Sequence, residues 1–198
     1  GAFNNTDAPT MGGHAIRHAV SRAGIESAAV EDVIMGCGMQ QGTQSQNVAR
    51  LCALSADLPV TTAGMTIDRQ CSSGMMAIAT ASKSIMAGEH DILVAGGLES
   101  ISLVQNEHAN MYRIIDKNLT AKHQHIYMPM LDTAEVVANR YDISRDDQDA
   151  YALQSQQRTA KAQDTGKYDD EIAPLASSMG IMDRETGKVS FRDVMLQK

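Results

Sequence analysis

The sequence predicts an α/β fold with a parallel sheet that is covered on both faces. Three short apolar runs, at residues 33–35, 63–68 and 91–95, have the length and composition of buried strands. The segments between these runs carry apolar residues at helical spacing. Strands that alternate with helices through short links form βαβ units, in which the strands are parallel and the helices lie on the faces of the sheet.

One helix precedes the first strand and another follows it. Apolar residues at helical spacing indicate the first helix as far as Ala23, and Gly24 follows at the position of a C-cap. The strand of residues 33–35 ends at Gly36, and Asn47 is then expected to cap a second helix. The residues expected on the apolar face of this second helix are Val48, Leu51, Cys52 and Ser55.

The second strand runs directly into a third helix. Residues 63–68 are interpreted as the strand and residues 72–87 as the helix, which Gly88 closes. The last strand, residues 91–95, leads into a pair of glycines. The third helix is rich in alanine and serine, whose small side chains permit close packing on every face. We therefore expect it to be buried at the centre of a structure.

Beyond about residue 101 the pattern changes. Residues 105–131 show little periodicity, which is typical of a functional loop or a packing arm. One helix is expected from Asp132, with Glu135 reaching back to its start, and a longer helix is expected from Ser144. Near the end, residues 184–187 separate two apolar stretches and predict a β-hairpin.

Composition narrows the class of protein. The 198 residues are 43% hydrophobic and 21% charged, which are values typical of a globular protein. The net charge of −7 argues against a surface for nucleic acid or anionic membrane. No apolar run approaches the length of a membrane span, and no signal peptide is expected. Three cysteines without paired spacing suggest a reducing compartment, so we expect a cytoplasmic protein.

Cys71 stands where the second strand turns into the third helix. The first N–H groups of a helix have no partner within it and carry positive partial charge, so they stabilise a nearby thiolate. Arg69 adds a positive charge close by in the sequence, and Ser72 and Gly74 are small enough to let a substrate approach the sulfur. Cys71 is therefore the candidate nucleophile.

Packing is the alternative interpretation of any free cysteine, because cysteine is among the most buried residue types. Cys37 lies between glycines at a strand end, and Cys52 lies on the apolar face of a helix, so both are interpreted as packing. His14 and His18 form an i, i+4 pair that is formally able to bind a metal, but an exposed helix face is the preferred interpretation. No metal site is expected.

The residues around Cys71 resemble those of a known enzyme family. The stretch DRQCSSGMMAIATASKSIMAGEHDILVAGGLESIS is similar to the nucleophile region of the thiolases, the acyl-CoA C-acyltransferases. That family has a Cys-x-Ser-Gly turn, then an alanine-rich central helix, then a strand ending in AGG-x-E-S. The resemblance extends to GAFNN…GGHAIRHAVSRAG, to VIMGCGMQQGTQSQNVAR and to TAEVVANRYDISRDDQDAYALQSQQRTAKAQDTGKYDDEIAPL, which is nearly the whole chain. It implies that Cys71 accepts the acyl group of an acyl-CoA as a thioester, with coenzyme A thioesters as substrates and no cofactor.

The resemblance also implies a layered α-β-α-β-α fold made of two related halves, with a loop domain inserted in the first half. By this likeness, residues 1–104 are part of the N-terminal core domain and residues 105–198 are part of the loop domain. The Asn-Glu-Ala-Phe, Gly-His-Pro and Cys-x-Gly motifs of the second half, which supply a base and enolate-stabilising donors, do not occur in this sequence. We therefore expect the missing C-terminal half to be required for activity, in a homodimer or homotetramer.

Met130 is the further candidate for substrate binding. In the segment Tyr127-Met128-Pro129-Met130-Leu131 it matches the methionine that in thiolases lies along the pantetheine and acyl region. An ordinary core methionine is an open alternative, since the chain has 13 methionines. Pro129 resembles the degradative pattern, whereas Leu131 replaces the usual glycine, so the acyl chain length is left open. Arg113, Lys117 and Lys122 are candidates for CoA phosphates or a neighbouring subunit, with solvated charge as the preferred interpretation.

Three functions fit these observations. The first is a thiolase, and the second is a non-catalytic thiolase-like module that binds acyl-CoA or a partner protein. The third is a ketoacyl synthase, which fits less well because the CSSGMMAI turn and the inserted loop region resemble thiolases more closely.

Overall fold

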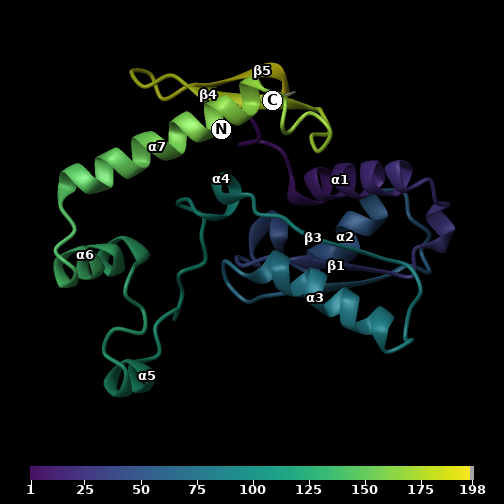
Figure 1. Cartoon of the computed structure of the whole chain (residues 1–198), viewed down its shortest axis with the longest axis horizontal. Helices are drawn as coiled ribbons and strands as arrows, with labels where there is room; N and C mark the ends of the chain where they lie inside the picture. The colour runs from purple at the N-terminus through teal and green to yellow at the C-terminus, as the bar shows by residue number, and fades with distance from the viewer. Residues whose placement is uncertain (197–198) are drawn as a thin grey trace. The chain divides into compact units, whose positions relative to one another are not determined.

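The computed structural model describes residues 1–196 and divides into two compact units. The first unit contains Gly1–Asn110 together with the segment that begins at Ala173. The second unit contains Met111–Ile172. Figure 1 shows the elements of both units, and each unit is described separately below.

A three-stranded parallel sheet organises the first unit. The strands are β1 (Asp32–Gly36), β2 (Ala63–Ile67) and β3 (Leu93–Gly97), in the order β2-β1-β3. The α/β class and the parallel pairing are confirmed. The third strand begins two residues later than expected and includes both glycines. Because the strands are parallel and in register, their carboxyl ends lie together at Gly36, Ile67 and Gly97.

Helices cover both faces of this sheet, as predicted (Figure 1). The helices α1 (Ala8–Ala23) and α2 (Val48–Ser55) pack on the face that carries Val33 and Met35. The helix α3 (Ser73–Met86) packs on the opposite face, where Ile34 contacts Ala77 and Ala81. Since alternate residues of β1 point to opposite faces, this one strand is buried from both sides.

Two expected helix caps have different outcomes. Gly24 ends α1, so the predicted C-cap is confirmed, and its φ of 67° is the left-handed conformation common at such caps. Asn47 lies directly before α2, but its side chain makes no capping hydrogen bond. Instead its amide donates 2.8 Å to the Gly64 carbonyl, and its carbonyl accepts 2.9 Å from the Thr66 hydroxyl. Asn47 therefore links α2 to β2 instead of capping α2.

The outward face of α3 is exposed, although its small side chains predict a helix buried at the centre of a structure. Met75 and Met86 are 74% and 86% exposed, and Ile78 and Ile85 are about half exposed. The side that faces the sheet is buried, where Ala77 and Ala81 pack with Ile34 of β1. The expectation of central burial is therefore wrong for this chain alone.

The predicted hairpin is present and belongs to the first unit. Its strands are β4 (Leu175–Met182) and β5 (Val189–Leu196), and the Asp183 carboxylate accepts two backbone N–H bonds in the turn between them. The hairpin contacts the start of the chain, where the Asn4 amide exchanges hydrogen bonds of 2.8 and 2.9 Å with the Gly180 backbone. The sequence assigned residues 105–198 to one loop domain, whereas the hairpin packs here with the first unit. The domain division of the complete protein stays a prediction.

The second unit contains three helices, none of whose residues is buried: α5 (Lys117–Lys122), α6 (Met130–Arg140) and α7 (Arg145–Asp164). The short helices outside this unit are α4 (Ile101–Val104), η1 (Ser27–Ala29) and η2 (Gly42–Gln44).

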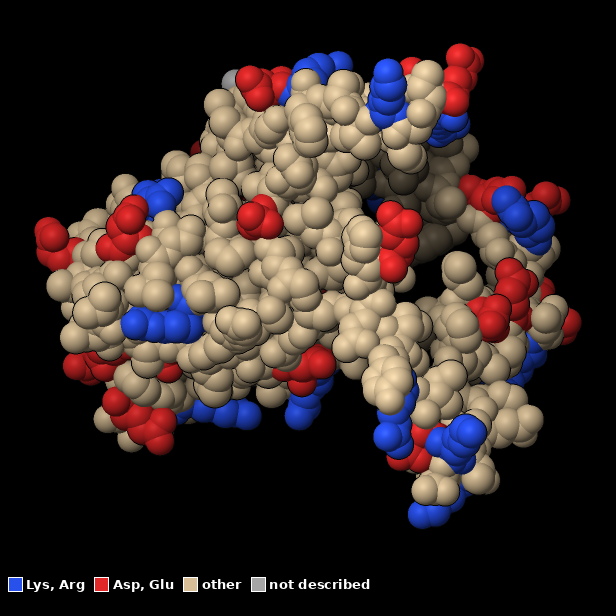
Figure 2. Space-filling view, turned by 180° about the vertical axis from the view of Figure 1, so that it is seen from behind, with Lys and Arg blue, Asp and Glu red and all other residues tan. Residues whose placement is uncertain are grey.

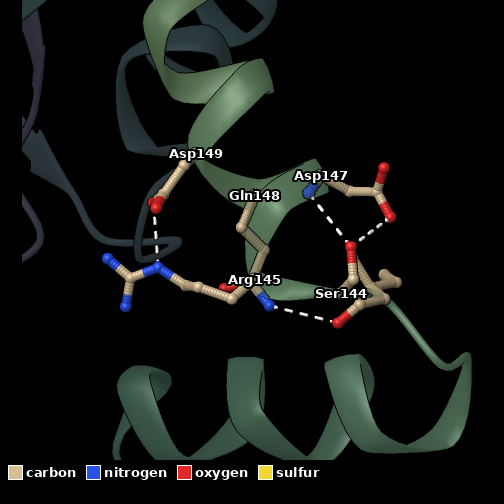
Figure 3. Close-up of polar contacts among 6 residues, drawn as sticks. Ser144, Arg145, Asp147, Gln148 and Asp149 are labelled. Carbon is tan, nitrogen blue, oxygen red and sulfur yellow. Dashed lines mark hydrogen bonds and ion pairs between the residues drawn. The ribbon is translucent and has the colours of Figure 1, made fainter.

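The two predicted helix starts in the second unit differ in outcome. Ser144 caps α7 as predicted: its hydroxyl accepts 3.1 Å from the Asp147 N–H and donates 2.6 Å to the Asp147 carboxylate (Figure 3). The predicted start at Asp132 is wrong. The helix α6 begins at Met130, directly after Pro129, whose backbone is extended (φ −57°, ψ 148°), and Asp132 lies within its first turn.

Candidate active site

Cys71 lies at the start of α3, two residues before the first helical residue Ser73, and it is exposed. It follows β2 after a short turn at the carboxyl end of the sheet. In parallel α/β sheets, ligands bind outside the carboxyl ends of the strands. Cys71 therefore lies at this edge of the sheet, and its role as the nucleophile stays a prediction.

Hydrogen bonds within the chain fix the turn that carries Cys71. The Asp68 carboxylate accepts 2.7 Å from the Gln70 N–H. The buried Ser73 hydroxyl accepts 2.9 Å from the Arg69 N–H and donates 2.6 Å to the Gln70 carbonyl. Gln70 itself has φ 49°, a left-handed conformation that is uncommon for residues with a Cβ atom. These hydrogen bonds therefore hold the residues before Cys71 and the residue Ser73 after it in fixed positions.

Two glycines let the start of α3 lie against the ends of the strands. A Cβ atom at Gly36 would overlap the backbone of Ser73 and Gly74. A Cβ atom at Gly97 would lie 3.3 Å from the Gly74 Cα atom and 3.1 Å from the Gly36 carbonyl oxygen. The sequence pattern predicts these glycines only as strand ends, whereas in the structure their lack of a side chain permits this close approach.

The other two cysteines are buried, as expected for packing residues. Burial, and then the nearby Glu99 carboxylate, raise the pKa of Cys37 to about 11. Burial raises the pKa of Cys52 to about 12. Both thiols are therefore protonated and unreactive near neutral pH, since the thiolate is the nucleophilic form.

A polar cluster that the sequence did not predict lies beside this turn. The carboxylate of Glu99 accepts hydrogen bonds from the Gly38 and Met39 N–H groups and from the side chain of Gln44, which is 0% exposed. Glutamine is an exposed residue in most proteins, so a buried glutamine could not be recognised by its type. The available signal was the position of Glu99 directly after a strand that ends at the same edge as Cys71.

The two neighbours of Cys71 that were named as binding residues share its position. Ser72 is exposed and precedes α3, and its side chain makes no capping hydrogen bond. Gly74 has open space on its side-chain face, where a Cβ atom would meet nothing within 4 Å. Both leave the approach to Cys71 uncrowded, and their role in binding stays a prediction.

Met130 lies in the second unit, at the first position of α6, and it is 75% exposed. It is therefore no core methionine of the described chain. It lines a hollow of about 340 Å³ together with residues from both ends of α6 and the start of α7, among them Thr133, Val137, Ile143 and Gln148. Its contact with a substrate stays a prediction.

The histidine pair on α1 is half-buried rather than exposed. The rings of His14 and His18 have centroids 4.4 Å apart, and the His14 Nε2 atom lies 3.3 Å from the Ala173 carbonyl oxygen. Within residues 1–196, no group of three or more His, Cys, Asp or Glu side chains is arranged to hold a metal ion.

The surface charges are mixed in sign. On the face shown in Figure 2, lysine and arginine side chains alternate with aspartate and glutamate and form no continuous basic patch. Among the described helices, none combines the length and the apolar character needed to cross a bilayer.

Comparison with known proteins assigns the family. Residues 1–190 match the model of the thiolase N-terminal domain. The chain belongs to the thiolase family. This thiolase chain is 40% identical over 167 residues to a 3-ketoacyl-CoA thiolase of Bacillus subtilis, a match that covers 83% of the chain and 42% of the relative.

Two further curated relatives match the chain with similar identity and also over less than half of their own length. A probable acetyl-CoA acyltransferase of Staphylococcus aureus is 36% identical over 188 residues, covering 89% of the chain and 47% of the relative. A 3-oxoadipyl-CoA/3-oxo-5,6-dehydrosuberyl-CoA thiolase of Escherichia coli is 40% identical over 167 residues, covering 76% and 41%. The chain thus spans less than half the length of these curated relatives.

Proposed function

We propose that the complete protein containing this chain is an acyl-CoA C-acyltransferase. It would catalyse the reversible conversion of a 3-oxoacyl-CoA and CoA to an acyl-CoA and acetyl-CoA. The observation that carries this proposal is the exposed Cys71 in a braced turn at the start of α3, in a chain of the thiolase family. The names of the curated relatives, which are thiolases and an acyltransferase, support the same reaction.

The proposed chemistry has two stages. The Cys71 thiolate attacks the 3-oxo carbon, the bond between carbons 2 and 3 breaks, and the electron pair leaves on acetyl-CoA as an enolate that is then protonated. The thiolate of free CoA then attacks the acyl thioester and releases acyl-CoA and the Cys71 thiolate. The protonation needs an acid and the enolate needs hydrogen-bond donors, which we assign to the C-terminal half of the complete protein.

Several other residues have proposed roles in binding. Ser72 and Gly74 would leave room for the thioester beside Cys71, and Met130 would lie along the pantetheine and acyl region. Arg113 and Lys117 line a hollow of about 630 Å³ in the second unit, which supports a role in holding CoA phosphates. The acyl chain length is left open.

The exposed apolar side of α3 supports a further expectation, that the C-terminal half packs there. We also propose a homodimer or homotetramer, as is usual in this family, and a cytoplasmic location. The three cysteines are all free thiols, which fits a reducing compartment.

The alternative is a non-catalytic module that binds acyl-CoA or a partner protein without turnover. One experiment separates the two: the complete protein is incubated with an acyl-CoA, digested, and analysed by mass spectrometry. An acyl adduct on Cys71 with release of one CoA per site is expected for the enzyme. Tight binding without an adduct would favour the module, and an adduct on Cys37 or Cys52 would refute the assignment of the nucleophile.

A further inference from the structure

A polar cluster that includes the buried Gln44 and the exposed Glu99 joins the ends of β1 and β3. Glu99 follows β3, and its carboxylate accepts 2.9 Å from the Gly38 N–H, 3.2 Å from the Met39 N–H and 2.6 Å from the Gln44 amide. The same Gln44 amide donates 2.7 Å to the Met39 carbonyl, and its oxygen accepts from the Ser100 N–H. The carboxylate and the amide thus hold the loop after β1 from two sides.

This loop lies directly against the turn that carries Cys71. A Cβ atom at Gly38 would stand 3.4 Å from the Gln70 carbonyl oxygen and 3.4 Å from the Glu99 carboxylate, so the Gly38 backbone lies close to both. The Cys37 N–H also donates 3.0 Å to the Ile67 carbonyl at the end of β2. Movement of the loop would therefore move Gln70, the residue before Cys71.

We infer that Glu99 and Gln44 are positioning residues for the nucleophile: they hold the loop of residues 37–39 against Gln70 and so fix the place of Cys71. The inference deepens the proposed function and rests on it for the identity of the nucleophile. Neither residue needs to touch the substrate for this role, because each acts through the backbone that contacts the Cys71 turn.

The hydrogen bonds that Glu99 accepts are part of the proposed role. A carboxylate offers only acceptors, which suits the three N–H donors that surround it. In Glu99→Gln one acceptor becomes an NH₂ donor of nearly the same size, so at least one of those N–H groups then faces another donor. The loop would lose its fixed position, while the fold, held by the apolar clusters on both faces of the sheet, would remain.

The test uses the complete protein and measures the rate of Cys71 alkylation by iodoacetamide, located by mass spectrometry. We expect Glu99→Gln to slow alkylation roughly tenfold and to lower kcat by ten- to about a hundredfold. The reason is that small displacements of reacting groups reduce reaction rates by factors of this size. The KM for the acyl-CoA should change much less. Gln44→Met should act in the same direction, and the double variant should be less than additive, since the two side chains act as one cluster.

Glu31→Gln is the matched control. Glu31 also accepts two backbone N–H bonds, 3.1 Å from Asp91 and 3.4 Å from Ile92, but it does so before β3, at the other end of that strand. A general loss of stability would therefore affect Glu31→Gln and Glu99→Gln alike. An equal effect of both changes on alkylation, or a rate within twofold of the unaltered protein in Glu99→Gln, would overturn the inference.

The alkylation measurement does not depend on turnover, so the two proposals fail separately. If alkylation of Cys71 depends on Glu99 but no acyl adduct forms, the proposed function is wrong and the positioning role stands. If the adduct forms and alkylation is independent of Glu99, the positioning role is wrong and the proposed function stands.

Discussion

The hydroxyl of Ser73 donates a hydrogen bond of 2.6 Å to the main-chain carbonyl of Gln70, and this bond closes the turn that presents Cys71. The same hydroxyl accepts from the Arg69 N–H at 2.9 Å. A side chain two residues after the candidate nucleophile therefore satisfies backbone groups on the side before it. The turn is fixed independently of any substrate.

Ser73→Ala tests this bracing. The change removes both hydrogen bonds and should lower the free energy of unfolding by about 1–3 kcal/mol. It should also slow the alkylation of Cys71 in the complete protein. Ser82→Ala is the control, because the Ser82 hydroxyl bonds to the Ile78 carbonyl within the same helix, far from the turn. Equal alkylation rates in the two variants would contradict the role of Ser73.

Cys71→Ser should abolish acyl transfer in the complete protein, because a serine hydroxyl at this position lacks the thiolate form at neutral pH. The circular dichroism spectrum should be unchanged, since Cys71 is exposed. Cys52→Ala is the matched cysteine control: it should cost stability, because Cys52 is fully buried, and keep acyl transfer. Acyl transfer that survives in Cys71→Ser would exclude Cys71 as the nucleophile.

Gly36→Ala and Gly74→Ala should have opposite effects on stability. The first places a methyl group into the backbone of Ser73 and Gly74, so we expect a loss at or above the upper end of roughly 1–3 kcal/mol. The second adds a methyl group in open space within α3 and should stabilise the fold by about 0.5–1 kcal/mol. Urea unfolding of the complete protein measures both. A neutral Gly36→Ala would show that the start of α3 can move away from β1.

The stability of the fold should decrease in mild acid through His18. Partial burial, and then the charges of His14, Arg22 and Arg17, lower the pKa of His18 below its usual 6.5. The unfolded chain therefore binds the proton more readily than the folded one, and unfolding is favoured as the pH falls through about 6.5. His18→Gln should reduce the fall in melting temperature between pH 7.5 and 5.5. An identical fall in both proteins would contradict the prediction.

The 198-residue chain by itself should show no steady turnover in a thiolysis assay. Its helix start can support acylation of Cys71, but the base and the enolate donors assigned to the C-terminal half are needed to complete the cycle. Loss of one such donor typically costs about a hundred- to a thousandfold in rate. We expect at most a stoichiometric release of CoA. Sustained turnover by the chain, purified free of any companion, would show that the first half is sufficient.

The sequence by itself determined the α/β class, the parallel strands and the place of Cys71. Each of these depends on local order along the chain: apolar runs of strand length, apolar residues at helical spacing, and a cysteine at the junction of β2 and α3. The caps at Gly24 and Ser144 were predictable for the same reason, because a cap is formed by residues within a few positions of the helix end.

The tertiary structure decided the surroundings of Cys71. The contact of Gly36 with Ser73 and that of Glu99 with Gln44 join residues 37 and 55 positions apart, and no local pattern specifies such a pair. Asn47 is a further example. Its position in the sequence predicts a cap for α2, but its side chain forms its hydrogen bond with Gly64 of β2 instead. Propensity along the chain fixes which elements form, whereas contacts between elements fix which polar groups meet at the site.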